Sequence, residues 1–339
     1  MLLVRADNLG DVVMLTPAIR ALRAFAPRAR FDLLASPAGA AAAPLIPELD
    51  DVLAVPAIWQ QLPGPGDGAG AREREWALVE RIRGRGYDTM LVFTSFSQSP
   101  WPAAHLGLLA GVGTRVVHSR EFGGAVATHW VTPPPDDTHQ VDRGLDLLAA
   151  VGVPARGGRL RLRIPDADVR AAAELLGQPA PFALVVPGAS CSARRYPAER
   201  FGAAAAAIAA AGLPVRVAGP EDEAALVADV VRAAAHPRVS ALPATTLPRF
   251  AAVVARAAVA LTNNSGGMHL ADALGTPVVA AYAGTEQIGD MRPRTVPAAL
   301  LGVTVPCSPC RLLRCPYRHE CLDVPPERLA AAACELAGA

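Results

Sequence analysis

Short apolar runs alternate with amphipathic segments along most of the chain. The apolar run at 2–5 is followed by Val12, Leu15, Ile19 and Leu22, and this three- and four-residue spacing predicts a helix with one buried face. Short apolar runs between helices are typical of buried strands in a parallel sheet. The other strands predicted in the first half are 31–35, 51–55 and 88–93, and the other helices are 105–110 and 141–150.

The alternation begins again after a segment rich in Pro, Gly and Arg. This segment, VPARGGRLRLRIP at 153–165, is the best candidate for an interdomain linker. The pattern in both halves predicts an α/β protein with two open parallel sheets covered by helices. We expect domains at 1–160 and 161–339, each long enough to bury its own core. The elements predicted in the second half are helices 166–176, 197–211, 221–234, 247–254 and 326–336, a helix whose first turn contains His269, and strands 182–186, 215–218, 258–261 and 277–282; a surface loop is predicted at 63–70.

The composition limits the class of protein. The 339 residues carry a net charge of +1, which gives no general attraction to nucleic acid, and all fixed positive side-chain charge is on arginine because the chain has no lysine. Much of the hydrophobic content is alanine, and no run of roughly 18 strongly apolar residues predicts a membrane-spanning helix. The N-terminus is charged too early, at Arg5, for a signal peptide. We expect a cytoplasmic protein whose membrane contact is at most peripheral, at the inner face of the cytoplasmic membrane.

Four junctions between a predicted strand and the next helix carry residues suited to chemistry. Ligands of open parallel sheets bind beyond the carboxyl ends of the strands, so we expect all four junctions to face a cleft between the domains. In the first, VRADNLGDVV at 4–13, Asp11 begins a helix whose dipole keeps the carboxylate ionised. Such a carboxylate can take a proton from a substrate hydroxyl. The alternative is that Asp11 only caps the helix.

The second and third junctions offer groups that suit a nucleotide. PGASCSARRYPAERF at 187–201 combines small residues, which let a ligand approach the backbone, with Arg194 and Arg195, which suit phosphate. The alternative is a solvated arginine pair before a helix. In VAGPEDEAAL at 217–226, acidic residues occupy the first helical turn, where they can accept hydrogen bonds from a ribose or simply stabilise the helix dipole.

The fourth junction, TNNSGGMHLADALGTP at 262–277, begins a helix with Ser265, Gly266 and Gly267. The unpaired N–H groups of a helix start form an anion site, and glycine lets a phosphate come close to the backbone. His269 in the first turn can add a donor, although a single histidine is more often structural.

The order and spacing of the four junctions resemble those of glycosyltransferase family 9, the heptosyltransferases. The resemblance covers nearly the whole chain, with both domains in the same order. The residues that match the family's motifs are Arg5, Asp7, Gly10, Asp11 and Val12; residues 187–190, Arg194, Tyr196, Pro197, Glu199 and Phe201; Gly219, Pro220 and Glu223; and Ser265, Gly266, His269, Leu270, Ala271, Ala273, Leu274, Gly275 and Pro277.

The resemblance implies a GT-B fold, in which a first Rossmann-like domain binds the acceptor and a second binds a nucleotide-diphosphate sugar. It implies an inverting, metal-independent enzyme that transfers a heptose-like sugar to a hydroxyl of a glycan or of a lipid-linked cell-envelope acceptor such as lipopolysaccharide. Asp11 is then the catalytic base, and the acceptor side includes Arg5, Asp7, Asn8 and Gly10. The implied donor contacts are Ser190, Arg194, Arg195, Glu223, Thr245, Asn264, Ser265, Gly266, Gly267 and His269.

The sequence departs from the family pattern at two of these positions. Arg194 replaces the usual lysine, which keeps the charge but changes its geometry. Asn264 replaces an aspartate that contacts the donor sugar, which keeps the size but loses the charge. The second change leaves open a catalytically degenerate relative that only binds a nucleotide sugar or glycan. A nucleotide-sugar epimerase of the same fold is a weaker alternative, because the donor domain offers no second acid/base pair.

A cysteine-rich segment, CSPCRLLRCPYRHEC, spans 307–321. Its four thiols, on Cys307, Cys310, Cys315 and Cys321, are close enough in sequence to form a tetrahedral structural zinc site. Disulfides, which the cytoplasm disfavours, and free thiols are the alternatives, and an iron–sulfur cluster is less favoured. We expect this segment to be a stapled loop without a catalytic role.

Overall fold

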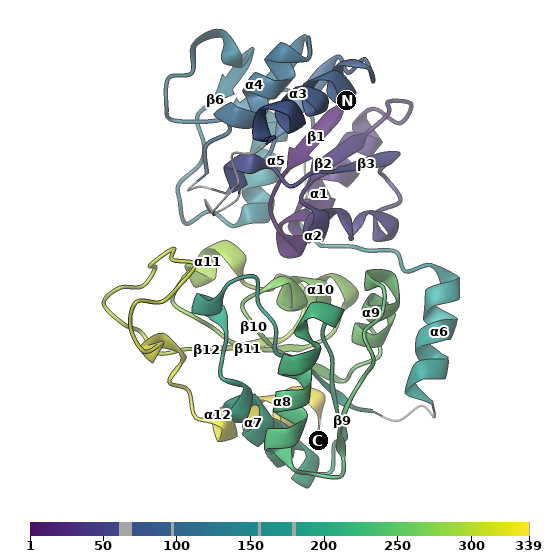
Figure 1. The fold of residues 1–339 in the computed structure, drawn as a ribbon, viewed down its shortest axis with the longest axis vertical. Helices are drawn as coiled ribbons and strands as arrows, with labels where there is room; N and C mark the ends of the chain where they lie inside the picture. The colour runs from purple at the N-terminus through teal and green to yellow at the C-terminus, as the bar shows by residue number, and fades with distance from the viewer. Residues whose placement is uncertain (61–69, 96–97, 155–156, 178–180, 339) are drawn as a thin grey trace. The chain divides into compact units, whose positions relative to one another are not determined.

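The computed structural model describes residues 1–60, 70–95, 98–154, 157–177 and 181–338. The chain forms two compact units, Met1–Gly158 and Arg159–Ala339 (Figure 1). The boundary between the units falls inside the segment predicted to be a linker, 153–165. Of the surface loop predicted at 63–70, all but Gly70 lies outside the described residues.

The first unit is built on a six-stranded parallel sheet with the strand order β3-β2-β1-β4-β5-β6. β1 lies near the middle and pairs with β2 on one side and β4 on the other, so the direction of winding reverses between β1 and β4. Ligands of such sheets bind beyond the carboxyl ends of the strands at this switch point. The elements are β1 (Leu2–Arg5), α1 (Leu9–Phe25), β2 (Asp32–Ala35), α2 (Pro37–Ala40), β3 (Asp51–Ala54), α3 (Ala71–Arg83), β4 (Thr89–Val92), α4 (Trp101–Leu109), β5 (Thr114–His118), β6 (His129–Val131) and α5 (Gln140–Ala150).

The second unit repeats this topology. Its parallel sheet has the order β12-β11-β10-β7-β8-β9, and the winding reverses between β7 and β10. The predicted α/β class with two open parallel sheets is therefore confirmed. The elements are α6 (Asp166–Leu176), β7 (Ala183–Val186), α7 (Ala198–Ala210), β8 (Val215–Val217), α8 (Ala224–Ala234), β9 (Val239–Ala241), α9 (Leu247–Val254), β10 (Val259–Asn263), α10 (Gly266–Leu274), β11 (Val278–Ala281), α11 (Ile288–Met291), β12 (Ala298–Leu301) and α12 (Pro326–Ala337).

The small alanine side chains of α7 let this helix pack closely against its neighbours. Ala204, Ala205 and Ile208 are fully buried. A Cβ on Gly202 would lie 2.8 Å from the Val230 carbonyl oxygen, so this glycine lets α8 come close to α7. The apolar composition of this segment therefore builds the core of the second unit. Among the described residues, no helix is both long enough and apolar enough to cross a membrane.

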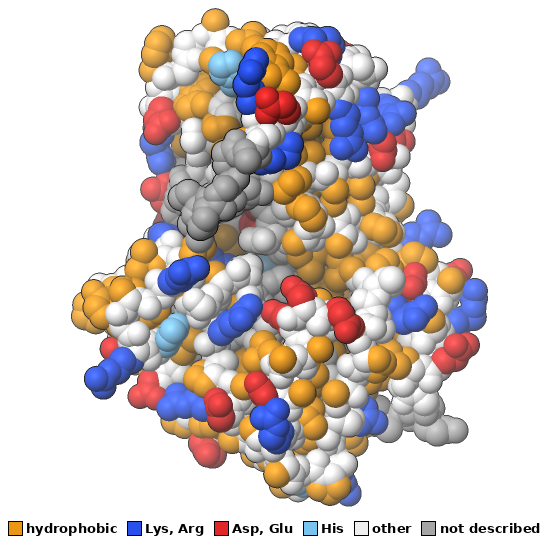
Figure 2. Space-filling model, viewed as in Figure 1, with side chains coloured by type: hydrophobic (Ala, Val, Ile, Leu, Met, Phe, Trp, Pro, Cys, Tyr) orange, Lys and Arg blue, Asp and Glu red, His pale blue; other side chains and the backbone are white. Residues whose placement is uncertain are grey.

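Charged side chains are distributed without a strong bias. Figure 2 shows acidic and basic side chains interspersed over the visible face of each unit. This agrees with the net charge of +1 and gives that face no extended area of one sign.

Candidate functional site

Asp11 lies in the first turn of α1, directly beyond the carboxyl end of β1. Its Oδ2 accepts a hydrogen bond from the backbone N–H of Asn8 at 3.2 Å, and its Oδ1 accepts one from Arg5 Nη2 at 2.8 Å. The carboxylate therefore caps the helix and is also fixed by a buried guanidinium. Its side chain remains 18% exposed, so the capping role leaves it accessible to a substrate. Gly10, also predicted on the acceptor side, is buried within α1.

Asp7 shares the guanidinium of Arg5 with Asp11. Asp7 Oδ2 lies 2.9 Å from Arg5 Nε, and Gln98 Nε2 donates to Asp7 Oδ1. Burial raises the pKa of the Asp7 carboxyl to about 6; Arg5 opposes this shift and the charge of Asp11 adds to it. Asp7 is therefore suited to holding Arg5, whereas the more exposed Asp11 is better positioned to meet a hydroxyl.

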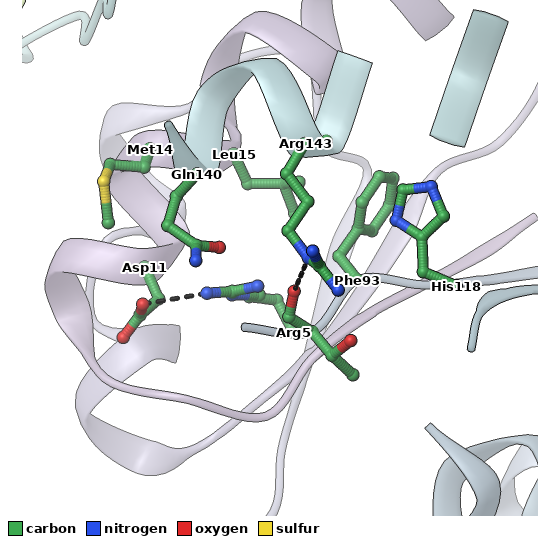
Figure 3. Close-up of a pocket in the computed structure, with 10 residues that line it drawn as sticks. Arg5, Asp11, Met14, Leu15, Phe93, His118, Gln140 and Arg143 are labelled. Carbon is green, nitrogen blue, oxygen red and sulfur yellow. Dashed lines mark hydrogen bonds and ion pairs between the residues drawn. The ribbon is translucent and has the colours of Figure 1, made fainter. Parts of the chain in front are cut away.

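A pocket opens beside Arg5 and Asp11 (Figure 3). It is built from the carboxyl ends of β1, β4 and β5 and from the first turns of α1 and α5, so it lies at the switch point of the first sheet. Met14, Leu15 and Phe93 form its apolar part. The polar residues that line it are Arg5, Asp11, Thr94, His118, Gln140 and Arg143.

Three side chains of this pocket are buried with polar atoms that lack a hydrogen-bond partner. These atoms are Thr94 Oγ1, both polar atoms of the Gln140 amide and Arg143 Nη1, on residues that are only 8%, 6% and 4% exposed. Arg143 Nε donates to the Thr94 carbonyl at 3.2 Å, but no ion pair joins Arg143 to a carboxylate in the described part of the chain. Buried polar groups without partners are costly, so this pocket favours a polar occupant.

His118 adds little charge to the pocket near neutral pH. Burial, with the positive charge of Arg143, lowers the pKa of His118 to about 4, although Asp146 opposes the shift. His118 Nε2 lies 3.2 Å from Asp146 Oδ2. Four of the polar lining residues were not predicted from the sequence: Thr94, His118, Gln140 and Arg143. Thr94 directly follows the predicted strand 88–93, so the rule that ligands bind at strand ends could have indicated it. His118 ends β5, which was not predicted from the sequence.

In the second unit, Asn263 joins two of the predicted donor segments. Its Oδ1 accepts a hydrogen bond from the Tyr196 N–H at 2.9 Å, and its Nδ2 donates to the Pro187 carbonyl at 2.7 Å. Ser265 Oγ donates to the Gly188 carbonyl at 3.2 Å. These bonds hold the segment after β7 against the start of α10, at the switch point of the second sheet.

The start of α10 offers fewer free donors than the sequence analysis expected. The Ser265 N–H already donates to the Asn263 carbonyl at 2.8 Å. The N–H groups of Gly266 and Gly267 lie in the first helical turn, where no carbonyl of the helix can reach them. Gly267 also packs tightly, because a Cβ there would lie 2.9 Å from Thr262 Oγ1. The anion site expected here is therefore reduced to two backbone donors.

Two further predicted donor residues are buried. Asn264 is 3% and His269 is 6% exposed. Both polar atoms of the Asn264 amide bond to the backbone of Ala283, which follows β11. The amide of Asn264 therefore serves to connect β10 and β11 at their carboxyl ends.

The Glu223 carboxylate lies directly against the backbone of Gly188. A Cβ on Gly188 would lie 1.8 Å from Glu223 Oε2, so only glycine permits this contact. Arg195 Nη2 lies 3.5 Å from Glu223 Oε1 and donates to the Ala189 carbonyl at 3.1 Å. Burial raises the pKa of Glu223, and Arg195 opposes the shift. The second and third junctions thus meet at this carboxylate.

The remaining predicted donor residues lie at the same edge of the second sheet. Ser190 follows β7 and is exposed, and Thr245 follows β9 and is partly buried. Arg194 Nε donates to Thr285 Oγ1 at 3.1 Å, and Arg194 Nη2 forms an ion pair with Glu286. Arg194 is therefore paired with a carboxylate of the protein itself at the position where a phosphate was predicted from the sequence.

The cysteine-rich segment contains free thiols. All six cysteines of the chain are unpaired, and within the described ranges no group of three or more His, Cys, Asp or Glu side chains is arranged to hold a metal. Burial raises the pKa of Cys321, and the other three thiols of the segment act in the same direction. The structural zinc site at Cys307, Cys310, Cys315 and Cys321 stays a prediction.

The sequence matches glycosyltransferase family 9 (heptosyltransferase) over residues 75–320. The chain belongs to this family. The predicted family and enzyme class are therefore confirmed, and the protein is a glycosyltransferase. The match includes the three junctions of the second unit and begins beyond the segment that contains Arg5 and Asp11. A search of curated proteins gives no match.

Several solved structures share the fold over nearly their whole length. The family 9 protein of Veillonella parvula has a TM-score of 0.80 at 19% identity, and the match covers 99% of this chain and 96% of that one. For the E. coli ADP-heptose LPS heptosyltransferase II, the TM-score is 0.77 at 19% identity, with 99% and 98% covered. For the E. coli heptosyltransferase WaaC with ADP, it is 0.68 at 16% identity, with 98% and 99% covered. The predicted GT-B fold is therefore confirmed.

Proposed function

We propose that this family 9 glycosyltransferase moves a heptose-like sugar from a nucleotide-diphosphate sugar to a hydroxyl of a glycan or cell-envelope acceptor. The transfer inverts the anomeric centre and uses no metal. The observation that carries the proposal is the Asp11 carboxylate, fixed by Arg5 at 2.8 Å and lining a pocket with buried, unpartnered polar groups. We expect the reaction in the cytoplasm, at the inner face of the membrane when the acceptor is lipid-linked.

Asp11 acts as the general base. It takes the proton of the acceptor hydroxyl while the hydroxyl oxygen forms a bond to the anomeric carbon. The bond between that carbon and the diphosphate oxygen breaks on the opposite face, and its electron pair leaves with the diphosphate. The ion pair with Arg5 and the hydrogen bond from the Asn8 N–H fix the orientation of the carboxylate.

The groups of the second unit bind the donor. Arg194 and the N–H groups of Gly266 and Gly267 neutralise the diphosphate, which gains charge as it leaves. Glu223 accepts hydrogen bonds from the ribose. Thr245 lies near the nucleobase of the donor. Ser190, Arg195 and His269 support the phosphate contacts. ADP-heptose is the first donor to test, because two of the relatives are named as an ADP-heptose LPS heptosyltransferase and as WaaC with ADP-2-deoxy-2-fluoro heptose.

The pocket of the first unit supports a proposal for the group that the acceptor carries. Thr94 Oγ1, Gln140 Nε2 and Arg143 Nη1 are buried donors, and the guanidinium of Arg143 lacks a carboxylate partner within the described ranges. An acceptor residue with an oxygen-rich, preferably anionic group satisfies all three donors. Because these atoms share a pocket with Asp11, that group belongs near the accepting hydroxyl.

The experiment combines donor binding with transfer. A thermal-shift panel of ADP, GDP, UDP, dTDP and CDP and their sugars identifies the nucleotide, because a ligand of the folded state raises the melting temperature. Asp11→Asn keeps the size of the side chain and is expected to lower transfer about 10²- to 10⁴-fold, with the donor-induced shift unchanged. Asp229→Asn, a surface change in α8, is the control.

Four outcomes would contradict the proposal. Transfer that survives in the Asp11→Asn variant would show that Asp11 is not the general base. A product with the donor's anomeric configuration, measured by NMR, excludes inversion. Transfer that stops in excess chelator and returns with added metal excludes the metal-independent mechanism. No shift with any nucleotide would favour a degenerate binding protein.

A further inference from the structure

One buried carboxylate joins two arginines from separate segments of the second unit. Glu286 follows β11, and its side chain is only 10% exposed. Its Oε1 pairs with Arg194 Nη2, and its Oε2 accepts a hydrogen bond from Arg311 Nη1 at 2.9 Å. The two guanidinium groups therefore converge on one anion, and each uses a different oxygen.

Hydrogen bonds hold both the guanidinium group and the backbone of Arg311. Its Nη2 donates to Oδ2 of the fully buried Asp290 in α11 at 3.0 Å. Its backbone N–H donates to the Thr285 carbonyl at 3.1 Å, with a left-handed φ of 59°. Non-glycine residues are uncommon in that region, so surrounding contacts must specify this conformation. Arg311 is therefore positioned by the fold and is not a freely solvated surface arginine.

Arg311 belongs to the cysteine-rich segment 307–321, for which the proposed reaction has no role. The segment is fastened to the carboxyl end of β11. The Cys310 N–H donates to the Gly284 carbonyl at 2.9 Å, and a Cβ on Gly284 would lie 1.9 Å from Ser308 Oγ. This close approach is what brings Arg311 to Glu286.

We propose that Arg311 is a second diphosphate-binding arginine, and that Glu286 holds the diphosphate position on both arginines until the donor displaces it. The inference rests on the proposed role of Arg194. Two guanidinium groups that share a carboxylate present planar, paired donors of the kind that phosphate oxygens bind. When the bond from the anomeric carbon to the diphosphate oxygen breaks, the electron pair stays on that oxygen, and both arginines stabilise its charge.

The test measures binding of nucleoside diphosphates and of inorganic pyrophosphate to the full chain by titration calorimetry. Arg311→Gln is expected to weaken binding by at least about tenfold, because a charge-assisted pair of donors is lost. Arg314→Gln changes an exposed arginine of the same segment and is expected to change nothing. Glu286→Gln is expected to tighten binding several-fold, because the competing charge is gone. A carboxylate with a purely structural role would loosen the site when removed.

The outcomes separate this proposal from the proposed function. Weaker binding in Glu286→Gln, or unchanged binding in Arg311→Gln, overturns the two-arginine site while sugar transfer by the unaltered protein stands. The expected variant effects on pyrophosphate without any sugar transfer overturn the proposed function alone. No binding of any diphosphate overturns both. If Arg311→Gln does not fold, Arg311→Lys keeps the charge without the planar fork, and it must still bind pyrophosphate more weakly than the unaltered protein.

Discussion

The side-chain amide of Asn264 pairs with the backbone of Ala283 through both of its polar atoms. Oδ1 accepts from the Ala283 N–H at 3.0 Å, and Nδ2 donates to the Ala283 carbonyl at 3.3 Å. A carboxylate could replace only the first of these bonds, since it has no hydrogen to donate. Asparagine is thus matched to this position of the fold, where the sequence analysis treated it as a departure from the family pattern.

We therefore expect Asn264→Asp to destabilise the protein. The new carboxylate would face the Ala283 carbonyl in a site that is 3% exposed, and this should lower the free energy of unfolding by about 1–3 kcal/mol. The loss should grow with pH as the buried group ionises. Urea unfolding at pH 5 and pH 8 checks both points. An Asn264→Asp protein as stable as the original at both pH values would contradict this account.

Arg143 and Arg115 are both buried, but they differ in how fully their guanidinium groups are hydrogen-bonded. Arg115 Nε donates to the Val126 carbonyl at 2.8 Å and Nη2 to the Ala125 carbonyl at 3.3 Å, whereas Arg143 keeps an unpartnered Nη1. Arg143→Met should leave stability unchanged or raise it by about 1–3 kcal/mol, because an unpaired buried charge is removed. Arg115→Met should lower stability by more than about 2 kcal/mol.

The same Arg143→Met variant should raise the KM for the acceptor at least about tenfold, since a charge-assisted contact is lost, and leave the KM for the donor unchanged. Denaturant unfolding and steady-state kinetics measure the two effects separately. A variant that is destabilised and keeps its acceptor KM would show that Arg143 is structural.

Asp7 and His118 should give the first unit opposing pH dependences. The folded protein holds a proton on Asp7 up to about pH 6, whereas an unfolded Asp has lost it above about 3.8, so this group makes stability fall as pH rises through that window. His118 binds its proton in the unfolded chain below about 6.5 but in the fold only below about 4, so it makes stability rise with pH.

Single substitutions should separate these two contributions. Relative to the unaltered protein, Asp7→Asn should gain stability as pH rises from 4 to 6, and His118→Asn should lose it between 4 and 6.5. Each difference should change by at most about 1.4 kcal/mol per pH unit. Urea unfolding at half-unit pH intervals measures both. Parallel pH profiles for all three proteins would refute the assigned shifts.

Gly188→Ala should affect the donor site more than the fold. The added Cβ would meet the Glu223 carboxylate, the far end of a flexible side chain, which can move away and so lose its position for the donor. We expect donor binding to weaken about tenfold or more, with a loss of stability below about 1 kcal/mol.

Gly267→Ala is the comparison for Gly188→Ala, because its Cβ would meet the packed Thr262 and Val186. It should lower the melting temperature clearly. Donor titration and thermal unfolding of the two variants provide the test, and equal effects on both measurements would contradict the assignment.

The sequence predicted eight of the twelve strands in the described part of the chain and missed β5, β6, β9 and β12. Three of the missed strands, β6, β9 and β12, lie at sheet edges, whereas the edge strand β3 was predicted. β1, β7 and β10 are buried on both faces and read as continuous apolar runs. β6 and β12 are edge strands with exposed positions, so their sequences resemble loops. In β5, Arg115 and His118 interrupt the apolar run although both are buried.

The candidate site shows the same limit. Asp11 and Arg194 stand next to recognisable strand ends, so local sequence was enough to single them out. Gln140 and Arg143 lie in the first turn of α5, far along the chain from β1, and only the folded topology brings them to the same pocket. The contact between Glu286 and Arg311 could not be predicted for the same reason, since it depends on how the cysteine-rich segment is fastened to β11.

The two sheets have the same strand order, and the chain passes between their units once, near Gly158. Every strand of the first sheet therefore precedes every strand of the second. During translation the first unit has its complete sheet before the first strand of the second unit has been made. The edge strands of the first unit can be covered, and its distant parallel strands can pair, before the rest of the chain is made. This shortens the time that unpaired strands are exposed on the ribosome.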